Sequence, residues 1–313
     1  MTDGAPEYVR YLPIIDRPRL EWPDGKRLAF WLSPNIEHYQ LFPPGNPYRN
    51  ATPRVPAPDV ADWSYRDYGN RVGFWRMLDV LDRYPIRPTA TANLAAFEMY
   101  PEICDAVVAR DWEIVSHGRH NTEYLFGISE ADERDYLNRN LTGFEKATGQ
   151  RPRGFLGPFA SMTPNTMNLL AECGVRYSCD WYCDDQPFPL QVERGRLISL
   201  PYSWEVNDAV MMEAGLGRFE IDDFVTVCRD QFDRLHRQSA DTGLAMHIAL
   251  HPFLIGRPHR IGELDRLLDY ILNHDEIWVA TGTEIADHYY ATQYDAIVSL
   301  LEERLPLTEG LNQ

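Results

Sequence analysis

The chain has 313 residues, of which 44% are hydrophobic and 25% charged, which is typical of a globular protein and excludes a disordered or fibrous one. Acidic residues outnumber basic ones by 47 to 30, giving a formal net charge of −17, so we expect no nucleic acid and no anionic membrane surface as partner. No run approaches the roughly 18 apolar residues of a spanning helix. Met1–Arg10 lacks the apolar core of a signal peptide, and the five cysteines have no disulfide or zinc-ribbon spacing. We therefore expect a cytoplasmic protein.

Apolar runs alternate along the chain with amphipathic stretches of helical period. In chain order we expect a strand at Leu28–Asn35, a helix at Tyr68–Tyr84, a strand at Pro88–Leu94, a helix at Met99–Ala109, a strand at Trp112–His117, a helix from Ser129 to Ala147 and a strand at Gly154–Gly157. The series continues with a helix between Thr163 and Gly174, strands at Arg176–Trp181 and Arg196–Trp204, a helix at Ile221–Gln238, a strand at Leu244–His251, a helix at Ile261–Asn273, a strand at Ile277–Thr281 and a helical tail.

This alternation favours a parallel sheet covered by helices. About seven or eight strand–helix units predict a closed or nearly closed barrel. We expect a single domain over residues 1–313, with an N-terminal extension (1–27) and a proline-rich loop insertion (41–63). A doubly wound open sheet is the alternative, but no glycine-rich turn follows the first strand, so its nucleotide-binding version lacks support.

Polar side chains follow the predicted strands at the points where those strands end. Asn35 and Glu37 come after the first strand, His117 closes the third, and Asp180 and His251 end later ones. Each alone could be a helix cap or a core residue, but the carboxyl ends of parallel barrel strands all open on one face. Carboxylates and imidazoles gathered at one mouth suit metal-assisted or acid–base hydrolysis.

An ordered set of motifs extends this pattern over most of the chain. The segments are Asn35-Ile36-Glu37, Tyr68–Arg76, Ser116–Asn121, Asp180 with Asp184–Pro187, Pro201-Tyr202 with Asn207-Asp208, and Leu250–Pro258. The set resembles the NodB-homology polysaccharide deacetylase superfamily, and it is most similar to the branch that includes cofactor-independent allantoinases. The resemblance implies a distorted (β/α)7 TIM-like barrel and a hydrolase of carbon–nitrogen bonds other than peptide bonds. It also implies a homodimer or homotetramer.

Deacetylases of this superfamily carry Asp-x-Asp after the first strand and His-x-x-x-His later, which supply a base and three ligands of a divalent metal. Here those positions hold Asn35, Glu37, His117 and Asn121, so the expected base and one imidazole ligand are missing. Two interpretations stay open. Either Glu37 and His117, with Asn121 or the neighbouring His120, hold zinc or manganese, or no metal binds and Glu37 or His117 acts as base on a water.

The resemblance implies that His251 protonates the leaving atom, while Asp180 orients a catalytic group or binds substrate. Other side chains near the strand ends are expected to bind substrate, with Arg71 alternatively at a subunit contact. The candidate substrate-binding residues are Asn35, Tyr39, Arg71, Asn121, Trp181, Trp204 and Asn207.

We expect hydrolysis of an amide, imide or ureide bond in a small metabolite, by attack of water on the carbonyl. The tetrahedral oxyanion would be held by backbone N–H groups or by a metal. One alternative is a metal-dependent carbohydrate N-deacetylase. The other is a ligand-binding barrel that has lost the reaction, an interpretation motivated by Asn35 and Asn121.

Overall fold

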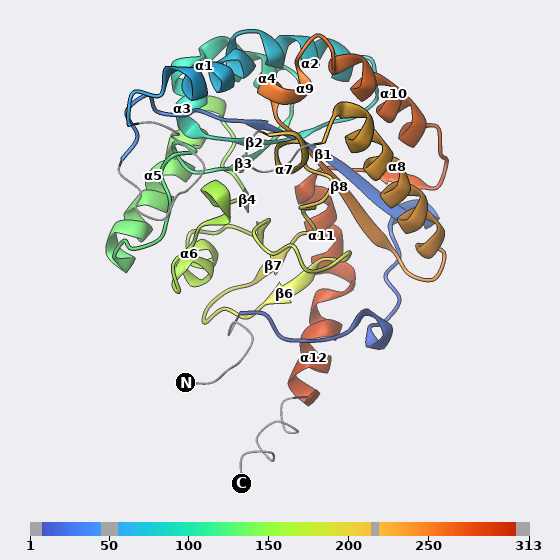
Figure 1. Cartoon of the computed structure of the whole chain (residues 1–313). Coiled ribbons are helices and arrows are strands. Elements are labelled where there is room, and N and C mark those ends of the chain that lie inside the picture. The colour runs from blue at the N-terminus through green and yellow to red at the C-terminus, as the bar shows by residue number, and fades with distance from the viewer. Residues whose placement is uncertain (1–7, 45–55, 214–218, 305–313) are drawn as a thin grey trace.

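The structure, a computed structural model, describes residues 8–44, 56–213 and 219–304. In these residues nine strands form one curled sheet, with most helices around its outside (Figure 1). The strand order is β6-β7-β5-β4-β3-β2-β1-β8, β9 also pairs with β1, and only the β6–β7 pair is antiparallel. The strands are β1 (Leu28–Ile36), β2 (Thr89–Ala92), β3 (Glu113–Ser116), β4 (Gly154–Phe155), β5 (Tyr177–Ser178), β6 (Phe188–Leu190), β7 (Leu197–Ser199), β8 (Leu244–Leu250) and β9 (Ile277–Val279).

Twelve α-helices are seen in the described residues, most of them following a strand. They are α1 (Val60–Tyr68), α2 (Phe74–Leu81), α3 (Leu94–Met99), α4 (Pro101–Ala109), α5 (Glu130–Thr148), α6 (Thr166–Glu172), α7 (Asp208–Met212), α8 (Ile221–Gln238), α9 (Pro252–Ile255), α10 (Ile261–Leu272), α11 (Gly282–Thr292) and α12 (Tyr294–Arg304). A π-helical turn at Gly69–Gly73 joins α1 to α2. None of these helices is long and apolar enough to cross a membrane.

Strand β1 is buried along its whole length because it separates two cores. Leu28, Phe30 and Leu32 belong to the outer core under the helices, whereas Ala29 and Trp31 belong to the inner core inside the curl. Side chains alternate between the faces of a strand, so a strand covered on both sides reads as one continuous apolar run. This burial explains why the sequence alone located the strand.

The sheet is curled but not closed, because β8 has a strand partner on only one edge in the described structure. The other edge of β8 contacts irregular chain: Ala245 N–H donates to the Asp185 carbonyl at 2.8 Å, and Ala249 N–H donates to the Val206 carbonyl at 3.1 Å. We call this gap between β8 and the β5–β7 side the seam. The predicted barrel class is confirmed, in a half-open form, and the doubly wound alternative is not.

Several element boundaries differ from the predictions for identifiable reasons. The helix expected at Tyr68 begins at Val60, where the Asp59 side chain accepts the Asp62 N–H. The helix expected at Met99–Ala109 is α4, which begins at Pro101, and the short helix α3 before it was not expected. The edge strand β6 was missed because Pro189 lies in its middle, and proline is tolerated in sheets chiefly at edges.

The two predicted additions to the barrel are only partly described. Residues 1–7 of the N-terminal extension and residues 45–55 of the loop insertion lie outside the described ranges. Of the remainder, Leu12, Leu20 and Trp22 are buried in the inner core. The predicted division into one domain, an extension and an insertion therefore stays a prediction.

Candidate active site

Three of the predicted strand-end residues meet at the carboxyl ends of β1, β3 and β8. Glu37 follows β1, His117 follows β3 and His251 follows β8, and all three are buried. Glu37 Oε1 lies 3.4 Å from His117 Nε2 and 3.4 Å from His251 Nε2. One carboxylate oxygen thus faces two imidazoles that come from opposite sides.

The second ring nitrogen of His251 faces a carboxylate. His251 Nδ1 lies 2.6 Å from Asp208 Oδ1, and the backbone N–H of His251 also donates to both oxygens of Asp208. Burial lowers the pKa of this imidazole, but the carboxylates of Glu37 and Asp208 outweigh burial and raise the pKa to about 10. His251 is therefore positively charged at neutral pH.

The second ring nitrogen of His117 faces a neutral group instead. His117 Nδ1 lies 2.8 Å from the backbone carbonyl of Leu156, the residue after β4. A carbonyl oxygen only accepts hydrogen bonds, so Nδ1 of His117 carries a hydrogen. The Nε2 atom of His117 faces Glu37 and the cavity.

Glu37 is held in place by a short relay of side chains. Its Oε2 accepts a hydrogen bond of 2.6 Å from the Tyr39 hydroxyl, which in turn accepts from the Asn121 side-chain amide. The Arg66 guanidinium lies 4.2 Å from the Tyr39 ring centroid and pairs with Glu213. Burial acts to raise the pKa of Glu37, but the two histidines outweigh it and hold that pKa well below its usual range.

These groups line a small cavity of about 70 Å³. One polar atom in it has no partner in the described structure: Asn121 Oδ1 is buried and accepts no hydrogen bond. The turn from Gly157 to Ala160 forms another wall, and its residues Phe159 and Ala160 have positive φ of 57° and 50°. Strained backbone of this kind is found disproportionately at functional sites.

Five of the candidate substrate-binding residues also line this cavity, namely Asn35, Tyr39, Asn121, Trp204 and Asn207. Asn207 has a structural task as well, because its Oδ1 accepts the Ala209 and Val210 N–H groups and caps α7.

Three predicted residues lie outside the lining of the cavity. Asp180 accepts hydrogen bonds from the Gly157 N–H at 2.7 Å and the Ser178 hydroxyl at 2.6 Å, and so it supports the turn from behind. Burial outweighs these bonds and raises the pKa of Asp180 to about 6. Trp181 points away from the site, and its indole nitrogen lies 3.4 Å from Met167 Sδ. The Arg71 side chain is 67% exposed and paired with Asp67.

The motif around Arg71 has a packing role in place of the expected substrate contact. A Cβ atom on Gly73 would lie 2.0 Å from the Pro252 carbonyl oxygen, so only glycine allows the π-helical turn to approach α9 this closely. Because Pro252 directly follows His251, this contact helps to position the loop that carries the histidine.

Sequence reasoning missed Asp208, Tyr202 and Arg66. The first two belong to quoted motifs, Asn207-Asp208 and Pro201-Tyr202, so a signal was present, but Asn207 was chosen in place of its neighbour. The Tyr202 hydroxyl donates to Asn35 Oδ1 at 3.2 Å. Nothing in the sequence pointed to Arg66, whose contact with Tyr39 depends on how α1 packs.

The expected metal ligands are only partly suitable. Glu37 and His117 offer two strong donors, and the unpartnered Asn121 Oδ1 is a weaker third, while His120 turns away to pair with His38, their Nδ1 atoms 2.9 Å apart. In the described ranges no group of three or more His, Cys, Asp or Glu side chains is arranged to hold a metal ion. A zinc site normally has three or four ligands of these types, so two strong donors and one amide oxygen make a poor match to one.

Comparison with known sequences identifies the family. The sequence profile of the polysaccharide deacetylases matches residues 65–178. A Schizosaccharomyces pombe protein assigned by its name to the polysaccharide deacetylases is 30% identical over 257 residues, which are 76% of this chain and 79% of that protein.

Two solved structures are similar over nearly their whole length. A Pseudomonas aeruginosa structure, also assigned by its title to the polysaccharide deacetylases, has a TM-score of 0.78 and 29% identity, with 88% of this chain and 95% of that chain covered. The structure of PuuE allantoinase has a TM-score of 0.76 and 28% identity, with 91% and 99% covered.

Proposed function

The chain belongs to the polysaccharide deacetylase family of carbon–nitrogen hydrolases, and we propose that it hydrolyses a small amide, imide or ureide by acid–base catalysis between two histidines. The observation that carries the proposal is the position of Glu37, whose Oε1 lies 3.4 Å from the Nε2 atoms of both His117 and His251. Two imidazoles with different partners on their far nitrogens supply the acid and the base that hydrolysis needs.

His117 is the proposed base. Its Nδ1–H is tied to the Leu156 carbonyl, so Nε2 accepts the proton of a water that attacks the substrate carbonyl. The ionised Glu37 next to it stabilises the imidazolium that forms. In this step an O–C bond forms and the electron pair of the C=O bond moves onto its oxygen.

His251 is the proposed acid. It carries a proton on Nε2 because the carboxylates of Glu37 and Asp208 raise its pKa to about 10, against the effect of burial. As the tetrahedral intermediate collapses, the C–N bond breaks and the nitrogen takes this proton. A departing nitrogen that leaves without a proton is a very poor leaving group, so this step needs an acid.

The oxyanion is proposed to meet the backbone of the Gly157–Ala160 turn. Pro158 has no N–H, and the Ala160 N–H is used by the Gly157 carbonyl at 2.8 Å, which leaves the Phe159 N–H as the available donor. Asp180 holds the Gly157 N–H from behind, so it acts here as a positioning residue. Fixed backbone donors of this kind stabilise developing negative charge.

The size and polarity of the cavity support a small substrate. A volume of about 70 Å³ suits a compact molecule better than a polymer chain. The unpartnered Asn121 Oδ1 needs a hydrogen-bond donor, and the N–H of an amide or ureide supplies one. The similarity to a structure titled an allantoinase supports the same choice.

A metal-dependent carbohydrate N-deacetylase is the second candidate, because Glu37 and His117 are possible ligands and the S. pombe relative is named as a polysaccharide deacetylase. The decisive experiment measures hydrolysis of hydantoins, dihydropyrimidines, acyl ureas and N-acetylated sugars by the purified protein, with and without a chelator, beside elemental analysis. We expect turnover of a small ureide or imide that survives chelation. Activity on N-acetylated sugars alone, lost together with a stoichiometric ion, would establish the second candidate and overturn the first.

A further inference from the structure

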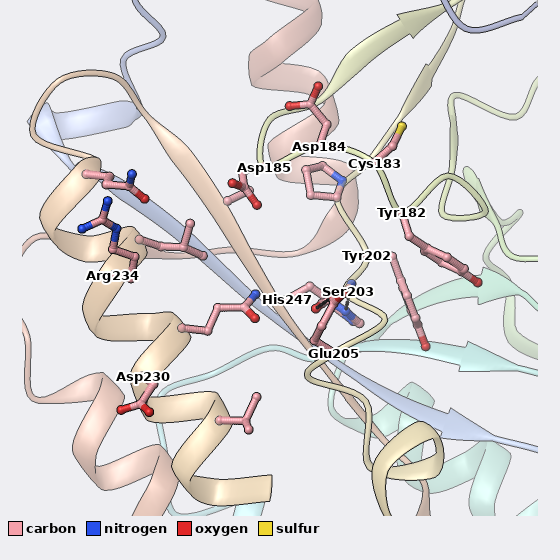
Figure 2. Close-up of a pocket in the computed structure, with 16 residues that line it drawn as sticks. Tyr182, Cys183, Asp184, Asp185, Tyr202, Ser203, Glu205, Asp230, Arg234 and His247 are labelled. Atoms are coloured by element: carbon pink, nitrogen blue, oxygen red, sulfur yellow. Dashed lines mark hydrogen bonds between the residues drawn. The ribbon is translucent and has the colours of Figure 1, made fainter. Parts of the chain in front are cut away.

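A second and larger cavity lies at the seam of the half-open barrel, next to the small one. It has a volume of about 700 Å³. Figure 2 shows His247 of β8 at its centre, Asp230 and Arg234 of α8 on one side, and Tyr182 and Tyr202 on the other. It exists because no strand continues the sheet beyond β8 in the described chain.

Tyr182 and Tyr202 line both cavities and so form the partition between them. The two rings are 5.9 Å apart, and Trp204, which also lines the small cavity, lies 5.2 Å from Tyr182. The partition is therefore an aromatic wall, with the small catalytic cavity on one side and the larger seam cavity on the other.

Tyr202 is the fixed half of this wall. It is buried, its hydroxyl donates to Asn35, and its ring lies 4.1 Å from the ring of His247. His247 is itself fixed, because its Nε2 is 2.7 Å from Ser33 Oγ and its Nδ1 accepts the Ser203 N–H at 3.3 Å.

Tyr182 is the less firmly held of the two tyrosines in this wall. It lies on the irregular chain after β5 and is only partly buried. The described structure gives its hydroxyl no hydrogen bond, so ring contacts with Tyr202 and Trp204 are what hold it. Tyr202, by contrast, has a hydrogen bond to Asn35 and a ring contact with His247 in addition to its contact with Tyr182.

We propose that Tyr182 is the residue that limits substrate size, by closing the small catalytic cavity against the seam cavity. This inference rests on the proposed function of the small cavity. Removing the ring joins the two spaces, and the seam cavity then takes the substituent of a larger substrate. That substituent is uncharged or cationic, because carboxylates outnumber the one guanidinium, that of Arg234, among the described lining residues. The lining carboxylates are those of Asp184, which pairs with Arg17, and of Asp185, Glu205 and Asp230.

The test is a binding series that does not depend on turnover. The probes are 5-alkylhydantoins with chains of zero to six carbons, titrated by calorimetry against the Glu37→Gln protein and against the same protein carrying Tyr182→Ala, Tyr182→Leu or Tyr182→Phe. Tyr182→Phe keeps the ring and is the matched control. Circular dichroism checks each fold, and Tyr182→Leu serves if the alanine variant does not fold.

We expect affinity to fall beyond short chains wherever the ring is present. In Tyr182→Ala or Tyr182→Leu it should rise by about three- to fourfold per added methylene, the gain for burying a CH₂ group. The same length limit in all variants, or binding of no probe by any, overturns the inference. Failure of the proposed function is a separate result, namely wild-type protein that binds these ligands and hydrolyses no amide.

Discussion

The two histidines that face Glu37 lie at the same distance from it but have different groups behind them. Each Nε2 lies 3.4 Å from Oε1 of Glu37. Behind His251 stands the Asp208 carboxylate at 2.6 Å, whereas behind His117 stands the neutral Leu156 carbonyl at 2.8 Å. The difference shows how a protein can give one side-chain type two proton-transfer roles through the partner of its far nitrogen.

The two partners also differ in how they can be altered. The partner of His251 is a side chain at the start of α7, and a substitution removes its charge. The partner of His117 is a backbone carbonyl after β4, which no substitution removes. The difference between the two histidines can therefore be reduced by substituting Asp208. Substituting Glu37 alters both histidines at once, because it faces both of them.

Glu37→Gln should have the largest effect, because it removes the negative charge that both imidazoles share. We expect kcat/KM to fall by about 10³–10⁴, the upper range for loss of acid–base function, with the fold retained. Steady-state kinetics and circular dichroism test this. Glu98→Gln is the matched control, since that carboxylate is exposed and pairs with Arg119; an equal loss in the control would show that the effect is not local.

Replacing each histidine separately should distinguish their roles. We expect about a 10²–10⁴-fold loss in both His117→Gln and His251→Gln with an alkyl amide substrate. With an activated anilide, whose nitrogen leaves without prior protonation, His251→Gln should recover most of its activity and His117→Gln should not. Recovery of both variants, or of His117→Gln alone, would contradict the assigned roles.

Asp208→Asn should make the two histidines more alike. The carboxylates of Glu37 and Asp208 raise the pKa of His251 to about 10 despite burial, so loss of one carboxylate lowers that pKa. The acid is then deprotonated earlier, and the alkaline limb of kcat/KM should move to lower pH, with a loss of about 10–100-fold at pH 8. A rate profile from pH 6 to 10.5 measures the shift. If the alkaline limb of kcat/KM does not move, Asp208 does not set the pKa of the catalytic acid.

Tyr39→Phe should have the smallest effect, because it removes one hydrogen bond to Glu37 and keeps the ring against Arg66. We expect a loss of about three- to tenfold in kcat/KM, which corresponds to a hydrogen bond of about 1 kcal/mol. Kinetics together with urea unfolding test it. A loss as large as that of Glu37→Gln would show that the hydroxyl itself takes part in the reaction.

The parts of the site that the sequence revealed follow from topology. Glu37, His117 and His251 were found because strand ends of a parallel barrel converge, and β1 and β8 are clear apolar runs. The Leu156 carbonyl could not be found, since a backbone oxygen leaves no residue signature. Asp208 meets a residue 43 positions away, and that contact depends on how α7 packs beside β8.

A one-residue shift explains the error at Trp181. The strand was expected to run from Arg176 to Trp181, but β5 ends at Ser178. Beyond that point the alternation of side chains no longer holds, so Trp181 packs toward Met167 and Tyr182 faces both cavities. A prediction of fold class is unaffected by an error of a few residues in a strand end, whereas a prediction of which residue lines a cavity depends on it.

The most direct measurement of the asymmetry between the histidines is nitrogen NMR of the imidazole rings from pH 6 to 11, with assignments from His117→Gln and His251→Gln. At pH 8 His251 should carry hydrogen on both ring nitrogens and keep it until about pH 10. The proposed role of His117 as base requires a hydrogen on its Nδ1 and none on its Nε2. A neutral His251 at pH 8, or a hydrogen on Nε2 of His117, would contradict the assignment of acid and base.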